Sequence, residues 1–384
     1  MKTLYSLILL GCICLCLSCS KRSQTGTTSP IIDTLPLLNT IAKTDTLKVM
    51  AYNVLYYGDG CQGATQTLDA YFKTIIQYTQ PDLLSCEKMN AFDPTPGAPG
   101  NLADEITNNV LNAVFPNQYA YATPTNISFG KGMSVLFFNK QKLTYVKTET
   151  LVANVTDFDL YKMYYNDINL SITHDTTFLY VVVNHTQSGS PSTTRDQQVT
   201  SEMNQLRAKF LSFPNLINMG DFNTASSLEA GYQSITMFSD SVTQMYNPPY
   251  SLDKVLQYPG NWDVTPYSVA AYLTTSTRAS ASIPNTCGTS GGAKGWFDHI
   301  FISNWLVSGS NYMSYVPFSY QTIGNDGNRL NVDINSNSPS ANNAAPAAVL
   351  NALFQFSNKY PVMIKLLVKA NRNAVSPIDP VERN

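Results

Sequence analysis

The sequence predicts an α/β sandwich in which two mixed β-sheets pack face to face and are flanked by helices. Strand-like runs alternate with amphipathic helical segments, and several strands follow one another with only short turns between them. No internal repeat and no Pro/Gly-rich boundary divides the core. The 384 residues are 43% hydrophobic, which is enough for one large domain with a sizeable core.

The first expected elements alternate between strand and helix. The run LKVMAYNV, which starts at Leu47, predicts a strand that leads into a Gly-rich loop. A helix follows because four apolar residues recur at helical spacing: Leu68, Phe72, Ile75 and Ile76. Pro81 ends that helix, and PDLLSCE leads directly into a second buried strand. A second amphipathic helix is expected over 101–115, with one apolar stripe of Leu102, Ile106, Val110 and Val114.

Strands dominate from about residue 117. We expect strands at MSVLFFN, KLTYVKTE, LYKMYYNDINLSI and TFLYVVVNH, the last two joined by a hairpin turn at THDTT. A helix over 193–211 precedes the strand LINMGDFN, and an irregular stretch over 225–294 precedes the strand WFDHIFIS. After a further irregular stretch over 325–345, a short helix and a final strand, YPVMIKLLV, complete the expected fold.

The first 19 residues have the pattern of an export signal. Lys2 supplies the positive charge, and the apolar run over 4–17 is too short for a comfortable membrane span. Ser18 before Cys19 is similar to the bacterial lipoprotein cleavage box, which would make Cys19 a lipidated N-terminus, although Cys16 stands where Leu is usual. The alternative is an ordinary secretory signal in which the cysteines are small apolar residues.

Both alternatives predict export. With lipidation, we expect a monomer anchored in the membrane of the bacterial cell envelope, in the periplasm or at the outer membrane. The Ser/Thr/Pro-rich segment 20–45 is then a flexible linker, 46–370 the folded domain and 371–384 a C-terminal tail.

Charge and cysteine content bear on the expected ligands and on the expected disulfides. The formal net charge of −2 predicts no broad basic face for scanning nucleic acid, although a metal site could still hold a phosphodiester locally. Outside the signal, Cys86 lies in an apolar run and is expected to be buried. Cys61 and Cys287 lie in Gly-rich loops, where they could form a disulfide or remain two separate thiols.

Polar residues at or within the core strands do not suit a purely structural role. They are Asn53, Glu87, His185, Asp221, Asn223 and Asp298. Each alone could be a loop cap, a surface position or an Asx turn. Strands that end on one edge of the sandwich would, however, bring all of them together in a single site. Carboxylates and carboxamides suit a hard cation such as Mg²⁺ (or Mn²⁺), which could bridge to a phosphate.

A family resemblance covers residues 47–367 and rests on six segments: MAYNVLY, QPDLLSCEKM, KGMSVLFFN, YVVVNHTQSGS, NMGDFNT and FDHIFIS. In this order they are similar to the endonuclease/exonuclease/phosphatase superfamily, which includes DNase I-like nucleases, neutral sphingomyelinases and inositol-polyphosphate phosphatases. The resemblance implies the four-layer DNase I-like sandwich and a Mg²⁺-dependent hydrolase of phosphoester bonds. Its substrate would be a small phosphoester, a lipid head group or a nucleic acid.

The resemblance also implies a role for each polar residue: Glu87 and Asn53 at the metal, Asp221 as general base for the attacking water, Asn223 and His185 at the scissile phosphate, and Asp298 as the aspartate that pairs with the family's terminal histidine. The remaining histidines are expected outside the site. His174 lies in a predicted turn, and His299 follows Asp298 directly in a strand, so its side chain faces the opposite way.

The end of the chain departs from the family pattern. In FQFSNKYPVMIKL, Asn358 and Lys359 stand where the resemblance places Asp-His. Asn keeps an oxygen ligand, and Lys keeps a charge that could bind the phosphate, but it has no acceptor nitrogen. We therefore expect a phosphoesterase with degraded catalytic positions and impaired or specialised turnover. The alternatives are a displaced register, a non-catalytic binder of a phosphorylated ligand, and a scaffold without ligand.

Substrate specificity is expected to lie in three loops, 56–66, 89–101 and 225–294. Trp262 and several Tyr residues in the last loop could stack on a base or sugar, or could simply pack the loop.

Overall fold

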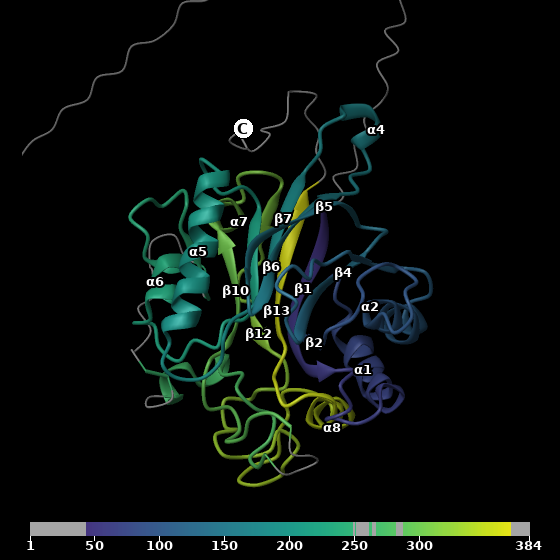
Figure 1. Cartoon of the computed structure of the whole chain (residues 1–384), viewed down its shortest axis with the longest axis vertical. Helices are drawn as coiled ribbons and strands as arrows, with labels where there is room; N and C mark the ends of the chain where they lie inside the picture. Colours follow the sequence, from purple (N-terminus) through teal and green to yellow (C-terminus); the bar gives the residue numbers. More distant parts are fainter. Residues whose placement is uncertain (1–43, 249, 251–260, 263–265, 282–286, 370–384) are drawn as a thin grey trace, which may run out of the picture. The chain divides into compact units, whose positions relative to one another are not determined.

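Two mixed β-sheets packed face to face form the centre of the computed structural model, which describes residues 44–248, 250, 261–262, 266–281 and 287–369 (Figure 1). Sheet A has seven strands in the order β11-β13-β1-β2-β4-β3, with β12 also paired to β13. Its strands are β1 (Thr44–Tyr57), β2 (Leu83–Asn90), β3 (Tyr119–Ala122), β4 (Gly132–Asn139), β11 (Met313–Tyr315), β12 (Gln321–Thr322) and β13 (Val362–Lys369).

Sheet B has six strands in the order β5-β6-β7-β8-β10-β9. Its strands are β5 (Leu143–Asn154), β6 (Thr156–Tyr165), β7 (Phe178–His185), β8 (Leu216–Asp221), β9 (Met245–Tyr246) and β10 (Asp298–Ser303). Strands β1 and β2 are parallel, as are β7 and β8, whereas β10 runs antiparallel to β8. The start of β10 therefore lies at the same edge of sheet B as the ends of β7 and β8.

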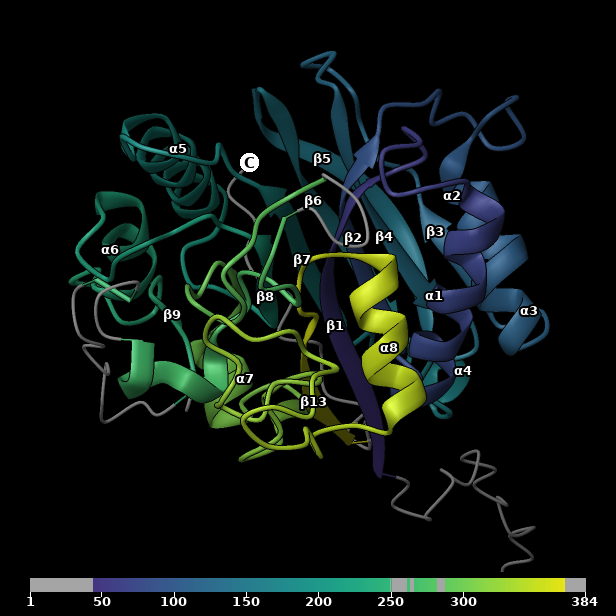
Figure 2. The same ribbon diagram turned by 90° about the horizontal axis from the view of Figure 1, so that it is seen from below.

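Helices cover the outer face of each sheet, as Figure 2 shows from below. On the side of sheet A lie α1 (Thr65–Thr79), α2 (Leu102–Glu105), the π-helical turn η1 (Ile106–Leu111), α3 (Asn112–Val114) and α8 (Ala347–Phe356). On the side of sheet B lie α5 (Thr193–Lys209) and α6 (Ala230–Thr236). The predicted sandwich of two mixed sheets flanked by helices is confirmed.

The alternation of side chains along each strand divides the core in two. Leu47, Val49 and Ala51 of β1 belong to a cluster drawn mainly from the strands of both sheets, so they lie between the sheets. Met50 and Tyr52 belong to the cluster that contains the apolar residues of the flanking helices. Burial of both faces explains why the central strands are continuous apolar runs.

Helix α1 contains the four predicted apolar residues, and all of them are buried. It ends at Gln80 in the left-handed conformation, directly before Pro81. The predicted helix over 101–115 is interrupted: Asn101 caps its start by accepting hydrogen bonds from the backbone of Ala103 and Asp104, but a π-helical turn then shifts the apolar stripe. Val114 is consequently only half-buried.

The two strands predicted to form a hairpin, β6 and β7, do pair antiparallel, but the tight turn predicted at THDTT is wrong. Strand β6 ends at Tyr165, and the next residues turn because the backbone N–H of Asn169 donates to the Asp167 carboxylate at 2.7 Å. A short helix, α4 (Leu170–Thr173), follows and ends at His174 in the left-handed conformation. His174 is exposed, as predicted.

Other local predictions also needed correction. The stretch over 225–294, expected to be irregular, contains α6, β9 and the 3₁₀-helical turn η2 (Pro266–Tyr272), and β3 was not expected as a separate strand. A short helix, α7 (Asn304–Ser308), follows β10. Strand β1 begins at Thr44, within the segment predicted as linker.

The predicted signal peptide, the lipidation site Cys19, almost all of the linker and the C-terminal tail lie outside the described residues. Across the described ranges, no helix combines the length and apolar character needed to cross a bilayer.

Candidate active site

The polar residues predicted at the strand ends lie on the inner faces of the two sheets. Because Val49 and Ala51 face the space between the sheets, alternation places Asn53 on the same face. The other strand residues follow the same rule, since each lies an even number of residues from an inner-core residue of its strand: Glu87 in β2, His185 in β7, Asp221 in β8 and Asp298 in β10.

Strand register brings these side chains to one edge of the sandwich. Asn53 lies opposite Glu87 in sheet A. In sheet B, Asp221 lies opposite His185 on one side and opposite Asp298 on the other. Asn53 joins the two groups, because its Nδ2 donates a hydrogen bond to Asp221 Oδ2 at 2.7 Å. The structure therefore assembles one site from both sheets.

Asp221 is the most heavily contacted carboxylate of the site. Its Oδ1 accepts the backbone N–H of Asn223 at 2.9 Å, and Lys359 Nζ lies 3.4 Å from its Oδ2. Burial alone would raise the pKa of Asp221, but the charges of Lys359 and His185 outweigh it and hold the pKa at about 2. Asp221 is therefore ionised at neutral pH and can accept a hydrogen bond or a proton.

Asn223 is held close to Asp221 by an unusual backbone. Its φ of 46° is left-handed, and its Nδ2 donates to the carbonyl oxygen of Thr186 at 2.9 Å. Gly220, with φ of 144°, is required here because a Cβ would lie 2.0 Å from the carbonyl oxygen of Asn184. This geometry places Asn223, the predicted phosphate ligand, beside the predicted general base.

Glu87 and Asp298 present buried carboxylate oxygens without a hydrogen-bond partner. Glu87 Oε1 accepts from the Ser85 hydroxyl, whereas Glu87 Oε2 and both oxygens of Asp298 have no partner in good geometry; the nearby Thr274 hydroxyl only partly offsets the rise in the pKa of Asp298. Burial raises the pKa of Glu87 well above its usual range, and the charges of Asp298 and Asp221 add to this. Burial, followed by the Asp221 charge, also raises the pKa of Asp298. Such oxygens are costly unless a cation or a proton compensates them.

These oxygens fit the ligand chemistry of a hard divalent cation. Magnesium prefers oxygen, needs only one or two protein carboxylates and keeps several waters. Glu87 and Asp298, whose carboxylates are close enough to raise the pKa of Glu87, supply such donors. Within the described ranges, no set of three or more His, Cys, Asp and Glu side chains is arranged to hold a metal ion. The donor set therefore suits a weakly held, largely hydrated Mg²⁺ rather than a closed metal cage.

Asn53, predicted beside the metal, is already engaged at both ends of its amide. Its Oδ1 accepts the backbone N–H of Leu55 at 2.9 Å, and its Nδ2 donates to Asp221. The contact that the structure shows for Asn53 is thus with the carboxylate of Asp221, which it orients. Its role at the metal stays a prediction.

Lys359 lies inside the site, at the position predicted for it. The strand expected after Pro361 begins at Val362. The Lys359 side chain is almost completely buried, with Nζ 4.8 Å from the ring centroid of Phe297 and ion-paired with Asp221. The ammonium group of Lys359 is thus in a position to contact a phosphoryl oxygen directly, without an intervening water.

The surroundings of Asn358 are matched to an amide. Its Nδ2 donates to the carbonyl oxygen of Thr289 at 2.8 Å and to the Thr289 hydroxyl at 2.9 Å. Gly288, at φ 86°, packs against this amide so closely that a Cβ would lie 2.3 Å from Asn358 Nδ2. An aspartate at 358 would turn a carboxylate oxygen toward the Thr289 carbonyl. Asn358 was predicted to be a degraded aspartate, but its contacts with Thr289 and Gly288 suit an amide.

Asn358→Asp is therefore expected to lower the free energy of unfolding by about 1–3 kcal/mol at neutral pH, because two buried hydrogen bonds are lost and an acceptor faces an acceptor. Chemical denaturation measures the change. Asn154→Asp, which adds the same charge at an exposed position, is the control and should change stability little. Equal stability of Asn358→Asp and the parent chain would contradict this account of the Thr289 contacts.

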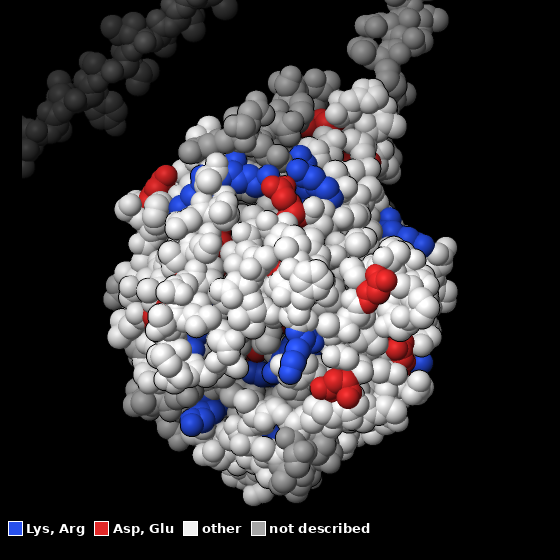
Figure 3. Space-filling model, viewed as in Figure 1, with Lys and Arg blue, Asp and Glu red and all other residues white. Residues whose placement is uncertain are grey.

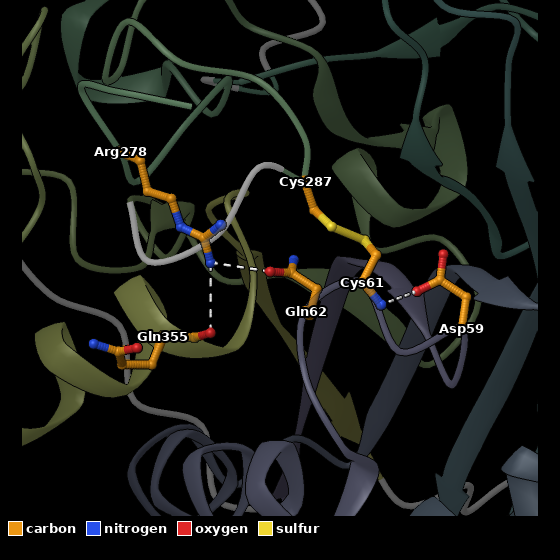
Figure 4. Close-up of a disulfide and its surroundings, with 6 residues drawn as sticks. All are labelled: Asp59, Cys61, Gln62, Arg278, Cys287 and Gln355. Atoms are coloured by element: carbon orange, nitrogen blue, oxygen red, sulfur yellow. Dashed lines mark hydrogen bonds between the residues drawn. A yellow bond between two sulfur atoms is a disulfide. The ribbon is translucent and has the colours of Figure 1, made fainter. Parts of the chain in front are cut away.

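A disulfide between Cys61 and Cys287 anchors the loop that carries Gly288 and Thr289 (Figure 4). The pairing, which the sequence left open, joins residues 226 positions apart with Cα atoms 6.0 Å from each other. Beside it, Nη2 of the buried Arg278 donates to Gln62 Oε1 at 3.2 Å and to the carbonyl oxygen of Gln355 at 3.4 Å (Figure 4). The loop after β1, the end of α8 and the 287–289 segment are thus tied together around Asn358. Cys86 is free and buried, as predicted.

The histidines separate as the strand pattern predicts. His185 lies in the site with a buried, unpartnered Nδ1, and burial, followed by the charges of Lys88 and Lys359, lowers its pKa to about 4 against the opposing effect of Asp221. His299 faces the outer side of sheet B, where its Nε2 lies 3.0 Å from the carbonyl oxygen of Trp296. Burial lowers the pKa of His299 to about 3, so it is neutral and outside the site.

Sequence reasoning missed a pocket of about 210 Å³ beside His185. Lys88 and Lys131 line it, together with Tyr56, Gly132, Val155 and the residues Thr156, Thr186, Gln187 and Ser188. The available signals were Lys88 directly after Glu87, Lys131 at the start of KGMSVLFFN and the polar residues that follow His185. Trp262, by contrast, is fully buried and contacts the rings of Tyr232 and Trp296, so it packs the loop rather than offering a stacking surface.

No family model and no curated protein matches the sequence. Three of the solved structures to which the chain is similar are the following. TDP2 from D. rerio, complexed with a single-strand DNA product, has a TM-score of 0.49 at 12% identity and covers 84% of this chain and 98% of its own. The catalytic domain of human Nocturnin with a bound sulfate anion has a TM-score of 0.46 at 14% identity, covering 85% and 96%. An endonuclease/exonuclease/phosphatase family protein from Bacteroides thetaiotaomicron has a TM-score of 0.46 at 13% identity, covering 85% and 99%.

Proposed function

We propose that the chain is a metal-dependent phosphoesterase of the endonuclease/exonuclease/phosphatase superfamily. The observation that carries this proposal is the composition of the site. An ionised Asp221 paired with a buried Lys359 lies in one site with the buried, unpartnered carboxylate oxygens of Glu87 and Asp298. A base, a cation for the phosphoryl group and oxygens for a hard metal are the parts that water attack on phosphorus requires.

In the proposed reaction, Asp221 accepts the proton of the attacking water while the water oxygen bonds to phosphorus and the bond to the leaving oxygen breaks. Asn53 orients Asp221 for this step. Lys359 Nζ, a donor only, stabilises the charge on the phosphoryl and leaving oxygens, and Asn223 and His185 contact the remaining phosphoryl oxygens. A bound Mg²⁺ or Mn²⁺, held by Glu87 and Asp298, would neutralise charge on the phosphate.

The site assignment predicts a metal response that depends on Glu87. Mg²⁺ or Mn²⁺ should raise the melting temperature of the parent chain, because an ion that binds only the folded state stabilises it. Glu87→Gln should remove this rise and leave the metal-free fold intact. Glu202→Gln is the matched control, since Glu202 is an equally buried carboxylate that contacts Asn184 and Asn218 outside the site. Identical metal responses of the parent chain and Glu87→Gln would show that the site is assigned wrongly.

The activity itself is tested by a panel of phosphodiesters and phosphomonoesters with Mg²⁺ and with Mn²⁺. The proposal expects turnover of at least one compound that stops on chelation of the metal. Binding of inorganic phosphate without any turnover would instead identify a non-catalytic binder in the cell envelope.

A further inference from the structure

Three apolar side chains are exposed on two neighbouring loops. Ile127 and Phe129, in the loop between β3 and β4, are 59% and 88% exposed, and Val155, in the turn between β5 and β6, is 48% exposed. The loops touch, because a Cβ on Gly130 would lie 2.1 Å from the carbonyl oxygen of Val155. We call Ile127, Phe129 and Val155 the apolar rim.

The rim is held in place by buried acceptors beneath it. The backbone N–H groups of Ile127 and Ser128 donate to the Asp157 carboxylate at 2.5 and 2.9 Å, and that of Thr125 donates to Asp159 at 2.8 Å. Both carboxylates belong to β6. The rim is therefore presented by a loop with a fixed hydrogen-bond pattern.

Folding does not explain the residue types at the rim. Phe129 and Val155 have φ of 49° and 63°, in the left-handed region that favours Gly and Asn. A β-branched Val is especially costly there, and an exposed Phe gains nothing from water. Phe318, which is 93% exposed with φ of 61°, shares this property as a single residue, whereas the three rim side chains lie together on touching loops. It is this clustering that points to contact with an apolar partner.

The rim borders the cationic pocket beside the site. Val155 lines the pocket together with Lys131, Lys88 and His185. Lys88 Nζ lies 4.6 Å from the ring centroid of Tyr56, which leaves its charge at the pocket wall. From the rim inward, the surface thus changes from apolar to cationic, and His185 in the pocket wall lies opposite the buried Asp221 in the strand register.

We propose that the apolar rim docks on a phospholipid bilayer and that the substrate is a phospholipid head group, an inference that rests on the proposed function. The order of surfaces matches an amphiphile: apolar side chains meet the acyl region, while the lysines meet the phosphate. Nucleic acid fits less well, because two of the three rim residues are aliphatic and only two lysines line the pocket. A second copy of the chain would need about 800 Å² per partner, far more than three side chains offer.

The test uses the chain from Ser20 onward, which lacks Cys19 and so any lipid anchor, with vesicles of phosphatidylcholine and phosphatidylglycerol. Co-sedimentation should fall at least about tenfold when Ile127→Ser and Phe129→Ser, the two rim residues that do not line the pocket, are combined. Combined Leu228→Ser and Phe318→Ser is the matched control, since these residues are 71% and 93% exposed but lie outside the rim and the pocket. The control should sediment like the parent chain.

A second readout separates this inference from the proposed function. The rim variant should hydrolyse a water-soluble phosphodiester at the parent rate but lose hydrolysis of vesicle lipid. Equal vesicle binding by the rim variant and the parent, or a rim variant that instead loses oligonucleotide binding or changes oligomeric state, would overturn the lipid proposal. Soluble turnover would then still stand. Vesicle binding without turnover of any phosphoester would leave the docking surface in place and refute the phosphoesterase.

Discussion

Asp221→Asn is expected to lower kcat for phosphoester hydrolysis by about 10²–10⁴-fold, the usual contribution of a positioned general base. The carboxylate is held ionised by Lys359 and oriented by Asn53, and an amide in its place cannot accept a proton from water. Steady-state kinetics with Mg²⁺ present measures the loss. Because the proposed role is in the chemical step, KM should change much less than kcat.

The substitution also leaves Lys359 without its counter-charge, which lowers stability. Kinetics are therefore measured below the melting temperature of each variant. Glu202→Gln is again the matched control: burial raises the pKa of Glu202 to about 8, so it is largely protonated at neutral pH, and glutamine preserves its shape. Its kcat should stay within about twofold of the parent value. If Asp221→Asn were as fast as this control, Asp221 would not be the base.

Lys359→Met is expected to reduce kcat by about 10²-fold or more, because the site loses the one cation that is in ion-pair contact with Asp221 among the described residues. Methionine keeps most of the side-chain volume against Phe297, so packing changes little. Lys359→Arg keeps the charge and should retain more activity than Lys359→Met. Inorganic phosphate should also bind more weakly to the methionine variant than to the arginine variant.

A double substitution tests whether Asn358 and Lys359 are degraded catalytic positions or residues that the site uses. A degraded site predicts that Asn358→Asp combined with Lys359→His raises turnover strongly. The contacts of Asn358 with Thr289 predict no such gain in turnover. An aspartate at 358 lacks the Nδ2 group that donates both hydrogen bonds to Thr289. Equal rates for Lys359→Met and the parent chain would show that the lysine has no part in catalysis.

Much of the fold followed from short-range patterns. The inward-facing positions of Asn53, Glu87 and Asp221 were predictable because each polar residue interrupts a long apolar run, and the alternation of side chains then fixes the face. The predicted strand end is confirmed only for Asp221, since β1 continues to Tyr57 and β2 to Asn90. His299 could be excluded from the site by the same alternation. Period and burial are local properties, so the sequence carries them directly.

The features that the sequence did not predict depend on contacts between distant residues. The Asn358–Thr289 contact spans 69 positions, and the disulfide spans 226. The pocket between Lys88 and Lys131 requires the register of β2 against β4, which is irregular after Cys86. The connection between β6 and β7 begins at Asp167 and Asn169 rather than at THDTT, because a side-chain hydrogen bond, rather than strand periodicity, decides the path there.

The most direct test of the phosphoesterase assignment is hydrolysis of a generic phosphodiester in ¹⁸O-labelled water with and without Mg²⁺. We expect turnover that requires the metal, with one ¹⁸O atom in the phosphoryl product, because water attacks phosphorus. Glu202→Gln should behave like the parent chain, whereas Glu87→Gln and Asp221→Asn should not. Turnover that is the same in all four proteins, or a parent chain that binds phosphate with no turnover of the substrate, would contradict the account.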